Sequence, residues 1–270
     1  MTNTTFKLRE ASLVSDRKVR PMMGLPVWEA LPARNVPYRL SDPFILLHEA
    51  TMQISQIANM DTEHPHRGFD NLWYILMGST STGHSTGPDG AIERADLPEG
   101  SLLHLRTGRG VRHAEGVGAD QLREGLDDEV RTVLFWVNLA RKDKDSEPRA
   151  IVLQREDIVT IQEGGAIARV LVGTGSPVEL GTPALIFDVE LAGGGRTMHY
   201  VPAEFQGFAY LLDGAASFGA NRARAEAGQL VLMGPGEGFV VEDSVPGTRY
   251  LLMAGKPYGE DPRFNGPYVD

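Results

Sequence analysis

The sequence has 270 residues, a formal net charge of −10 from 36 acidic and 26 basic residues, and no cysteine. The absence of cysteine excludes disulfide bridges, thiolate metal sites and cysteine nucleophiles, so a metal would need histidine, carboxylate, carbonyl or water ligands. The negative charge argues against direct binding to nucleic acid or to an anionic membrane, because both favour basic patches. No apolar run approaches the roughly 20 residues that span a bilayer, and the polar N-terminal segment lacks a secretory signal's apolar core. We therefore expect a cytoplasmic globular protein.

Short segments rich in β-branched, leucine and aromatic residues follow one another along the chain, separated by glycine and proline. In chain order they are 43–47, 71–77, 101–106, 131–137, 185–191, 208–212, 229–233 and 248–253. This pattern predicts an all-β protein built as a sandwich or barrel. The segment GPDG at 87–90 predicts a hairpin, because Asp-Gly tolerates the positive φ of tight turns. Residues 118–130 are expected to hold one short helix or a loop.

Two blocks of sequence occur twice in the same order. YILMG at 74–78 matches YLLDG at 210–214, an offset of 136, and 99–105 resembles 227–233. The blocks 99–105 and 227–233 are each followed by a Gly-x-Gly, at 108–110 and 234–236. The repeat predicts two tandem β-barrel domains, residues 1–140 and 141–270, joined at the charged, proline-containing segment 140–148.

Three of the seven histidines form a pattern typical of a metal site. His64 and His66 form an H-x-H pair, and His113 and Glu115 form an H-x-E pair further along the chain. Residues i and i+2 of a strand project from the same face, so each pair can present two ligands together. Three imidazoles and a carboxylate would fill four positions of a six-coordinate ion and leave two open. Fe(II), Mn(II), Ni(II), Cu(II) and Zn(II) all accept such ligands.

The segment HPHRGF at 64–69 resembles the signature of the pirins, a family within the cupin superfamily. Further segments resemble pirin motifs in the same order and with similar spacing, namely 41–47, 84–92, 107–115, 135–139, 255–258 and 265–269. The resemblance covers almost the whole chain from about residue 40.

The resemblance implies a bicupin, which consists of two β-sandwich barrels, with one iron-type metal in the N-terminal barrel. Matching the motifs residue by residue assigns the metal to His64, His66, His113 and Glu115, with Fe(II) as the preferred ion. The resemblance also implies, for some members, dioxygenolytic opening of the flavonol quercetin. Other members are described as nuclear, redox-sensitive transcriptional co-regulators.

The sequence departs from the pirin pattern at two positions. Asp70 stands where the family usually has glutamate, and its shorter side chain is expected to support the metal site indirectly at most. His48 stands where pirins usually carry an acidic residue.

The second repeat provides an internal comparison for the metal site. The offset of 136 aligns His64 with Tyr200 and His66 with Pro202, and the preceding glycines align His113 with Phe239. None of these can replace an imidazole. His199 is one residue out of this alignment, which would turn its side chain to the other face of the strand. We therefore expect the C-terminal barrel to bind no metal.

Other residues near the motifs allow two interpretations each. The arginines could attract an anionic substrate or form structural ion pairs, and we favour ion pairs for Arg67, Arg106, Arg109 and Arg112. The aromatic residues could line a pocket or pack in the core, namely Phe69, Trp73 and Phe135. His104 is expected to be structural and His84 to face solvent.

The leading functional hypothesis is a quercetinase-type dioxygenase acting on a small phenolic substrate and O2, with Glu115 accepting the substrate's hydroxyl proton. The alternative is a metal- or redox-sensing regulatory protein that acts through a protein partner. A third hypothesis is a related dioxygenase with another small organic substrate. The sequence gives no prediction of the oligomeric state.

Overall fold

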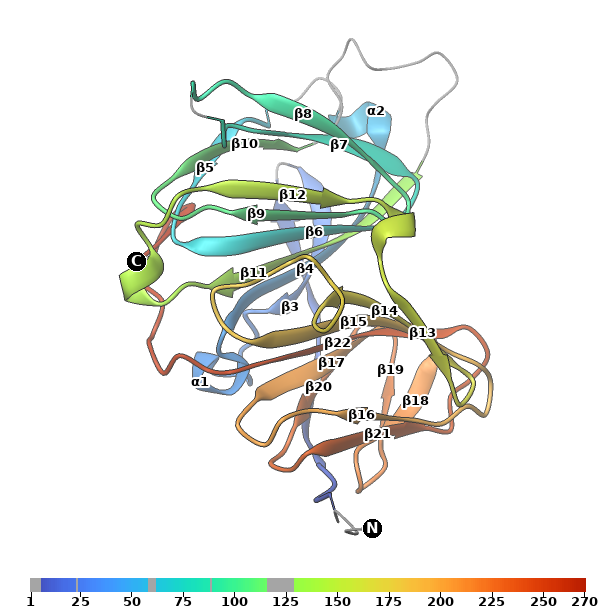
Figure 1. Ribbon diagram of the computed structural model, residues 1–270. Helices are drawn as coiled ribbons and strands as arrows, with labels where there is room; N and C mark the ends of the chain where they lie inside the picture. The colour runs from blue at the N-terminus through green and yellow to red at the C-terminus, as the bar shows by residue number, and fades with distance from the viewer. Residues whose placement is uncertain (1–5, 23, 58–61, 88, 116–128) are drawn as a thin grey trace. The chain divides into compact units, whose positions relative to one another are not determined.

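The computed structural model describes residues 6–22, 24–57, 62–87, 89–115 and 129–270 (Figure 1). Almost every regular element is a strand, which confirms the all-β prediction. The helices in the described part of the chain are single turns: α1 (Tyr38–Ser41), α2 (Ile54–Ile57) and 3-10 turns at Arg141–Asp143 and Arg155–Asp157. Most of the predicted helix or loop at 118–130 lies outside the described residues.

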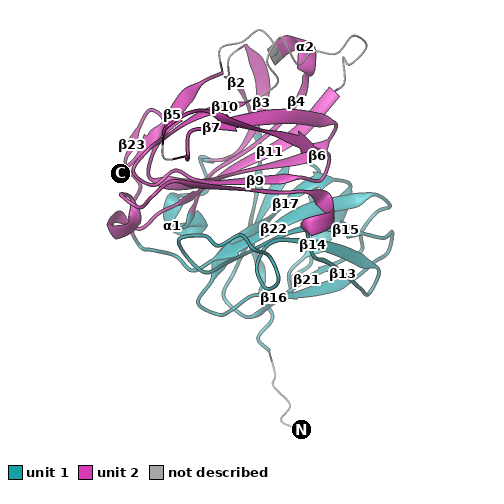
Figure 2. Ribbon diagram, turned by 45° about the horizontal axis from the view of Figure 1, so that its top comes forward, with its two compact units in different colours: residues 1–17, 32–43, 158–259 teal, residues 18–31, 44–157, 260–270 magenta. Residues whose placement is uncertain are grey.

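The chain forms two compact units (Figure 2). The N-terminal unit comprises residues 18–31, 44–157 and 260–270, and the C-terminal unit comprises residues 1–17, 32–43 and 158–259. Each unit therefore takes segments from both ends of the chain, so the predicted division between residues 140 and 141 does not describe them.

The N-terminal unit contains a seven-stranded and a four-stranded antiparallel sheet. The large sheet has the order β12 (Arg149–Leu153), β9 (Leu102–Arg106), β6 (Phe69–Met77), β11 (Glu129–Asn138), β4 (Phe44–Gln53), β3 (Leu25–Leu31) and β2 (Lys18–Met22). The small sheet has the order β5 (His64–His66), β10 (Val111–Glu115), β7 (Ser79–His84) and β8 (Glu93–Pro98). The pairing of β7 with β8 confirms the hairpin predicted around 87–90. The chain ends in the hairpin β23 (Phe264–Asn265) and β24 (Tyr268–Val269).

The C-terminal unit has the same plan. Its large sheet has the order β1 (Ala11–Asp16), β20 (Gln229–Met233), β17 (Gln206–Asp213), β22 (Thr248–Gly255), β15 (Ala184–Leu191), β14 (Ala166–Val172) and β13 (Thr160–Glu163). Its small sheet has the order β16 (Thr197–Tyr200), β21 (Gly238–Glu242), β18 (Ala215–Phe218) and β19 (Ala223–Glu226).

Strand register confirms the internal repeat. Tyr74 in β6 lies opposite Leu102 in β9, and Tyr210 in β17 lies opposite Leu230 in β20. The glycines that end the repeated block, Gly78 and Gly214, have φ of +77° and +73°, which only glycine adopts without strain. The two copies therefore share both pairing and turn geometry.

The core of the N-terminal unit shows which face of its large sheet is internal. Trp73 and Ile75 of β6 cluster with Leu97 of β8 and Val111 of β10. Side chains alternate along a strand, so every second residue of β6, counted from Trp73, faces the small sheet. That face positions the functional site.

Arg9 fastens the N-terminal segment to the C-terminal unit. Its side chain is buried, and its guanidinium donates to the carbonyl oxygens of Gly234 at 2.9 Å, Pro202 at 2.7 Å and Phe205 at 3.0 Å. An uncompensated charge would be costly there, so these bonds hold the segment around Arg9 against the C-terminal unit.

Candidate metal centre

The two motifs that the sequence selects come together on neighbouring strands of the small sheet. β5 pairs with β10 so that His113 lies opposite His64 and Val111 lies opposite His66. The imidazole centroids of His64 and His66 are 4.5 Å apart, and that of His113 is 5.5 and 5.7 Å from them. Glu115 Oε1 lies 3.4 Å from His113 Nε2. The structure therefore places all four predicted residues in one cluster.

Backbone carbonyls orient the three imidazoles. The Nδ1 atoms of His64, His66 and His113 face the carbonyl oxygens of Thr62 at 2.6 Å, Pro267 at 3.5 Å and Gly83 at 3.1 Å, respectively. A carbonyl oxygen only accepts, so Nδ1 of His64 and of His66 carries the proton and their Nε2 atoms keep a lone pair. His113 faces an acceptor at both ring nitrogens, Gly83 O at Nδ1 and Glu115 Oε1 at Nε2. Metal-binding histidines are commonly held in this way.

The spacing of the donor atoms suits a metal ion. His64 Nε2 and His66 Nε2 are 2.9 Å apart, and two ligands of one ion are roughly 3.0–3.4 Å apart when each lies ~2.1 Å from it. With both Nε2 atoms unprotonated, no proton bridges them, and a cation would relieve their repulsion. Among the described residues, no group of three or more histidine, aspartate or glutamate side chains is positioned to hold a metal ion as it stands, so the four residues remain candidate ligands. Their nitrogen and carboxylate donors fit a divalent transition metal.

Electrostatics favour the ligand forms of these groups. Burial, together with the nearby imidazoles of His64 and His113, lowers the pKa of His66 to about 3. Burial alone would raise the pKa of Glu115, but its hydrogen bond with His113 and the nearby imidazoles lower it to about 2. At neutral pH the cluster therefore offers a neutral imidazole beside an ionised carboxylate.

Two stacked aromatic rings, those of Phe69 and Trp136, adjoin the cluster. The rings of Phe69 and Trp136 stack with centroids 4.1 Å apart, and each meets the His66 ring edge-on at 5.2 Å. Phe69 was a candidate pocket residue, whereas Trp136 was not singled out. Its signal was the strand alternation, which puts Trp136 on the same face as Asn71, its partner in β6.

The C-terminal hairpin forms a strap, residues 264–270, over the H-x-H loop. Val269 N donates to Arg67 O at 3.0 Å. Buried Lys144 Nζ donates to the carbonyl oxygens of Gly68 and Val269 and to Asn138 Oδ1, each at 2.9 Å. Gly68 has φ +89°, and a Cβ there would overlap the Val269 carbonyl oxygen. The strap also supplies the Pro267 carbonyl that faces His66, so it helps to hold one of the candidate ligands.

The arginines around the cluster form ion pairs. A hollow of about 310 Å³ beside His66 is lined by Arg67, Arg109 and Arg112, among others. Arg67 pairs with Asp145 at 3.3 Å and Asp270 at 3.1 Å, Arg109 with Glu147 at 2.6 Å, and Arg112 with Glu63. These contacts support the ion-pair interpretation over an open cationic mouth.

The remaining candidates on the large sheet are structural. Buried Asp70 accepts hydrogen bonds from His104 Nε2 at 2.9 Å and Arg106 Nε at 2.9 Å. Trp73 packs in the core, and Phe135 is fully buried opposite Leu72, on the sheet's other face. His104 is therefore structural, as expected.

The prediction that His84 faces solvent is wrong. His84 is only 7% exposed, because β7 continues up to it and pairs it with His113. The turn begins after His84 rather than at it.

The expected orientation of His199 is also wrong. His199 lies opposite Phe239, just as His64 lies opposite His113, so its offset from His64 is 135 rather than 136. His199 is buried and shares a 2.6 Å hydrogen bond with the Tyr250 hydroxyl, whereas Tyr200 is 53% exposed. A one-residue difference in the connection to the next strand shifts the register.

The corrected register leaves the C-terminal unit with one imidazole at the equivalent site. Positions corresponding to His66, His113 and Glu115 hold Val201, Phe239 and Val241, all fully buried. The absence of metal there remains a prediction, now on a corrected alignment.

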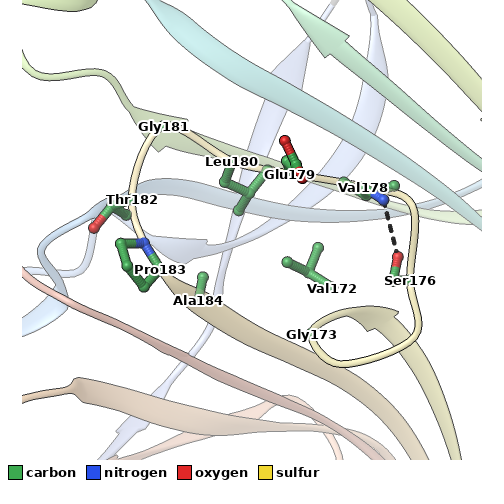
Figure 3. Close-up of a pocket in the computed structure, with 10 residues that line it drawn as sticks. All are labelled: Val172, Gly173, Ser176, Val178, Glu179, Leu180, Gly181, Thr182, Pro183 and Ala184. Atoms are coloured by element: carbon green, nitrogen blue, oxygen red, sulfur yellow. Dashed lines mark hydrogen bonds between the residues drawn. The ribbon is translucent and has the colours of Figure 1, made fainter.

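A second hollow lies within the C-terminal unit (Figure 3). It measures about 400 Å³ and is lined by the segment from Val172 to Ala184. Its side chains are mostly small or aliphatic, and Val178 N donates to Ser176 Oγ at 3.2 Å across its rim. Glu179 is the one ionisable residue among those lining it, so it is a poor candidate for the predicted chemistry.

Comparison with known proteins identifies the family. The family model described as "Pirin" matches residues 27–137, and the model described as "Pirin C-terminal cupin domain" matches residues 186–270. Pirin-1 of Arabidopsis thaliana is 32% identical over 242 residues, covering 87% of this chain and 79% of the relative. The chain belongs to the pirin family. Its two β-sandwich units are the two cupin domains of that family, which confirms the bicupin prediction.

Solved structures show the same fold. A quercetin 2,3-dioxygenase from Acinetobacter baumannii superposes with a TM-score of 0.82 at 22% identity, covering 97% of this chain and 92% of that one. The bacterial pirin YhhW from Escherichia coli, solved in complex with nickel(II), gives a TM-score of 0.67 at 15% identity, covering 94% and 99%. At these identities the likeness concerns the fold. Among the described residues, no helix is long and apolar enough to cross a membrane.

Proposed function

We propose that this pirin is a metal-dependent dioxygenase of the quercetin 2,3-dioxygenase type, with Fe(II) as its metal. The observation that carries the proposal is the convergence of three imidazole rings and the Glu115 carboxylate inside one sandwich. The A. baumannii quercetin 2,3-dioxygenase supports it, because that enzyme has the same two-domain fold.

The ligands proposed for the metal are His64, His66, His113 and Glu115. When bound, the metal would supply Lewis-acid activation of the substrate hydroxyl and a site for dioxygen. The chain's own residues supply the rest. Backbone carbonyls hold His64 and His66 in the ligand tautomer, and the Phe69–Trp136 stack provides an apolar flat surface for a planar phenolic ring. Glu115 is proposed to accept the proton of the substrate hydroxyl.

The test is turnover by the purified, Fe(II)-loaded protein with quercetin and O2. Ring opening consumes one O2 and releases one carbon monoxide per flavonol, with no external reductant. Carbon monoxide release that is lost in Glu115→Gln supports the proposal. No release from protein with intact metal refutes the quercetinase reaction.

The regulatory alternative would be favoured by a free basic stripe at the barrel mouth. The arginines found there are paired with carboxylates, so no observation on the described residues favours that alternative over the enzyme.

A further inference from the structure

Buried polar atoms without partners mark a second set of groups inside the N-terminal unit. Both amide atoms of Asn71, the Trp136 Nε1–H and His48 Nδ1 are buried and have no hydrogen-bond partner among the described residues. Asn71 is fully buried and His48 is 4% exposed. A buried polar group without a partner is costly, so native proteins normally satisfy it with water or a ligand.

These groups lie on the internal face of the large sheet. Trp136 is directly opposite Asn71 on one side and Leu46 on the other. His48 is two residues further along β4, opposite Leu134, which is itself opposite Trp73. The side chains of Asn71, Trp136 and His48 therefore lie on the same face of the sheet as Trp73, whose side chain packs in the internal core.

This placement puts the groups beside the metal ligands. The Trp136 ring meets the His66 ring at 5.2 Å. On ladder spacing, His48 and Trp136 are about 8 Å apart at their Cα atoms, and His48 and Asn71 about 12 Å. One ligand with several polar groups along its length can reach all three.

Glu29 fixes the hydrogen-bonding sense of His48. Its carboxylate lies 3.1 Å from His48 Nε2 and accepts from Lys18 at 2.8 Å and Arg20 at 2.7 Å. Because a carboxylate only accepts, His48 Nε2 carries the proton and Nδ1 is an acceptor. The two nearby cations are held by Glu29, so the His48 end offers no free positive charge.

We propose that His48, oriented by Glu29, forms with Asn71 and Trp136 a subsite that binds a neutral, polyhydroxylated phenolic beside the metal ligands. A substrate hydroxyl donates to His48 Nδ1, and carbonyl or hydroxyl oxygens accept from Trp136 Nε1 and the Asn71 amide. The absence of a cation in this set makes it unsuited to a carboxylate or phosphate ligand. The inference rests on the proposed function, since the phenolic is the proposed substrate.

The experiment measures anaerobic binding of quercetin and of 3-hydroxyflavone, which lacks the additional ring hydroxyls, to Fe(II)-loaded protein. We expect the wild type to prefer quercetin at least tenfold. His48→Leu should abolish the preference, and His48→Gln, which can both donate to Glu29 and accept from the ligand, should restore part of it. His199→Leu replaces an equally buried histidine in the other unit and should leave the preference unchanged.

Asn71→Leu provides a second readout. Leucine has a similar size and no polar atoms, so the variant should melt at the same or a higher temperature while binding quercetin at least tenfold more weakly. A buried asparagine with only a structural role would instead lose stability on substitution.

The outcomes separate the two proposals. If the wild type opens quercetin but His48→Leu and Asn71→Leu keep its preference and affinity, the subsite is wrong and the buried atoms hold water only. If the loaded wild type binds neither flavonoid, both the proposed function and the subsite are overturned.

Discussion

The support of the metal site by Lys144 gives a quantitative prediction. Lys144→Met removes an ammonium that donates three 2.9 Å hydrogen bonds to Gly68, Val269 and Asn138. Hydrogen bonds to a charged group contribute about 1.5–3 kcal/mol each, so the three are worth about 5–9 kcal/mol together. Burial opposes them, because it lowers the pKa of Lys144 to about 8, which corresponds to about 3 kcal/mol of desolvation. The net loss of unfolding free energy is therefore about 2–6 kcal/mol.

The same substitution should weaken metal binding. Without Lys144, the strap and the Gly68 turn lose their common anchor, and the Pro267 carbonyl no longer holds His66. Loss of a group that orients a metal ligand typically costs 10- to 100-fold in affinity, and we expect about tenfold here.

The assays are urea unfolding of the metal-free protein and competition for Fe(II) or Ni(II) with a chromophoric chelator. Lys142→Met is the matched control, since Lys142 is exposed on the same turn. Equal stability and equal metal affinity in the two variants would refute the anchoring role of Lys144.

Three further predictions concern the fold. Gly68→Ala should lose about 1–3 kcal/mol of stability or more, because its φ is positive and an added Cβ would overlap the Val269 carbonyl oxygen. Gly90→Ala is the control, since Gly90 also has a positive φ but lies in open space, and it should lose only the part that comes from the backbone. Equal losses of the two variants in urea unfolding would contradict the overlap at Gly68. Arg9→Met should lose about 3 kcal/mol, because buried carbonyl oxygens lose their donor, and a loss below 0.5 kcal/mol, within the ordinary range of a surface substitution, would exclude the fastening role. Burial lowers the pKa of His199 to about 4, so the unfolded chain binds more protons between about pH 6.5 and 4, and about 3 kcal/mol of stability should be lost as the pH falls through that window. His199→Phe should flatten this part of the pH–stability curve relative to wild type, and an unchanged slope would refute the assignment.

Much of the candidate metal site was predictable because its information is local. The H-x-H and H-x-E pairs use the two-residue alternation of strands, and a strand pairing of His64 with His113 is enough to bring them together. The repeat was readable for the same reason, since glycines with positive φ such as Gly78 and Gly214 punctuate both copies.

The residues that the sequence did not reveal depend on contacts distant in the chain. Lys144 donates to Gly68, 76 residues before it, and to Val269, 125 residues after it, and nothing in its neighbourhood signals a buried ammonium. The orientation of His199 depended on one extra residue in a connection, which an ungapped offset cannot detect. The compact units do not divide at residue 140, because edge strands such as β1 pair far along the chain.

The proposed ligand set is tested most sharply by metal stoichiometry, from elemental analysis of wild type, His113→Ala and His199→Ala purified without chelator. We expect one transition-metal ion per chain in wild type and His199→Ala, and less than about a tenth of that in His113→Ala, because breaking the three-imidazole set removes a primary ligand. Unchanged metal content in His113→Ala, or two ions per chain in wild type, would contradict this expectation.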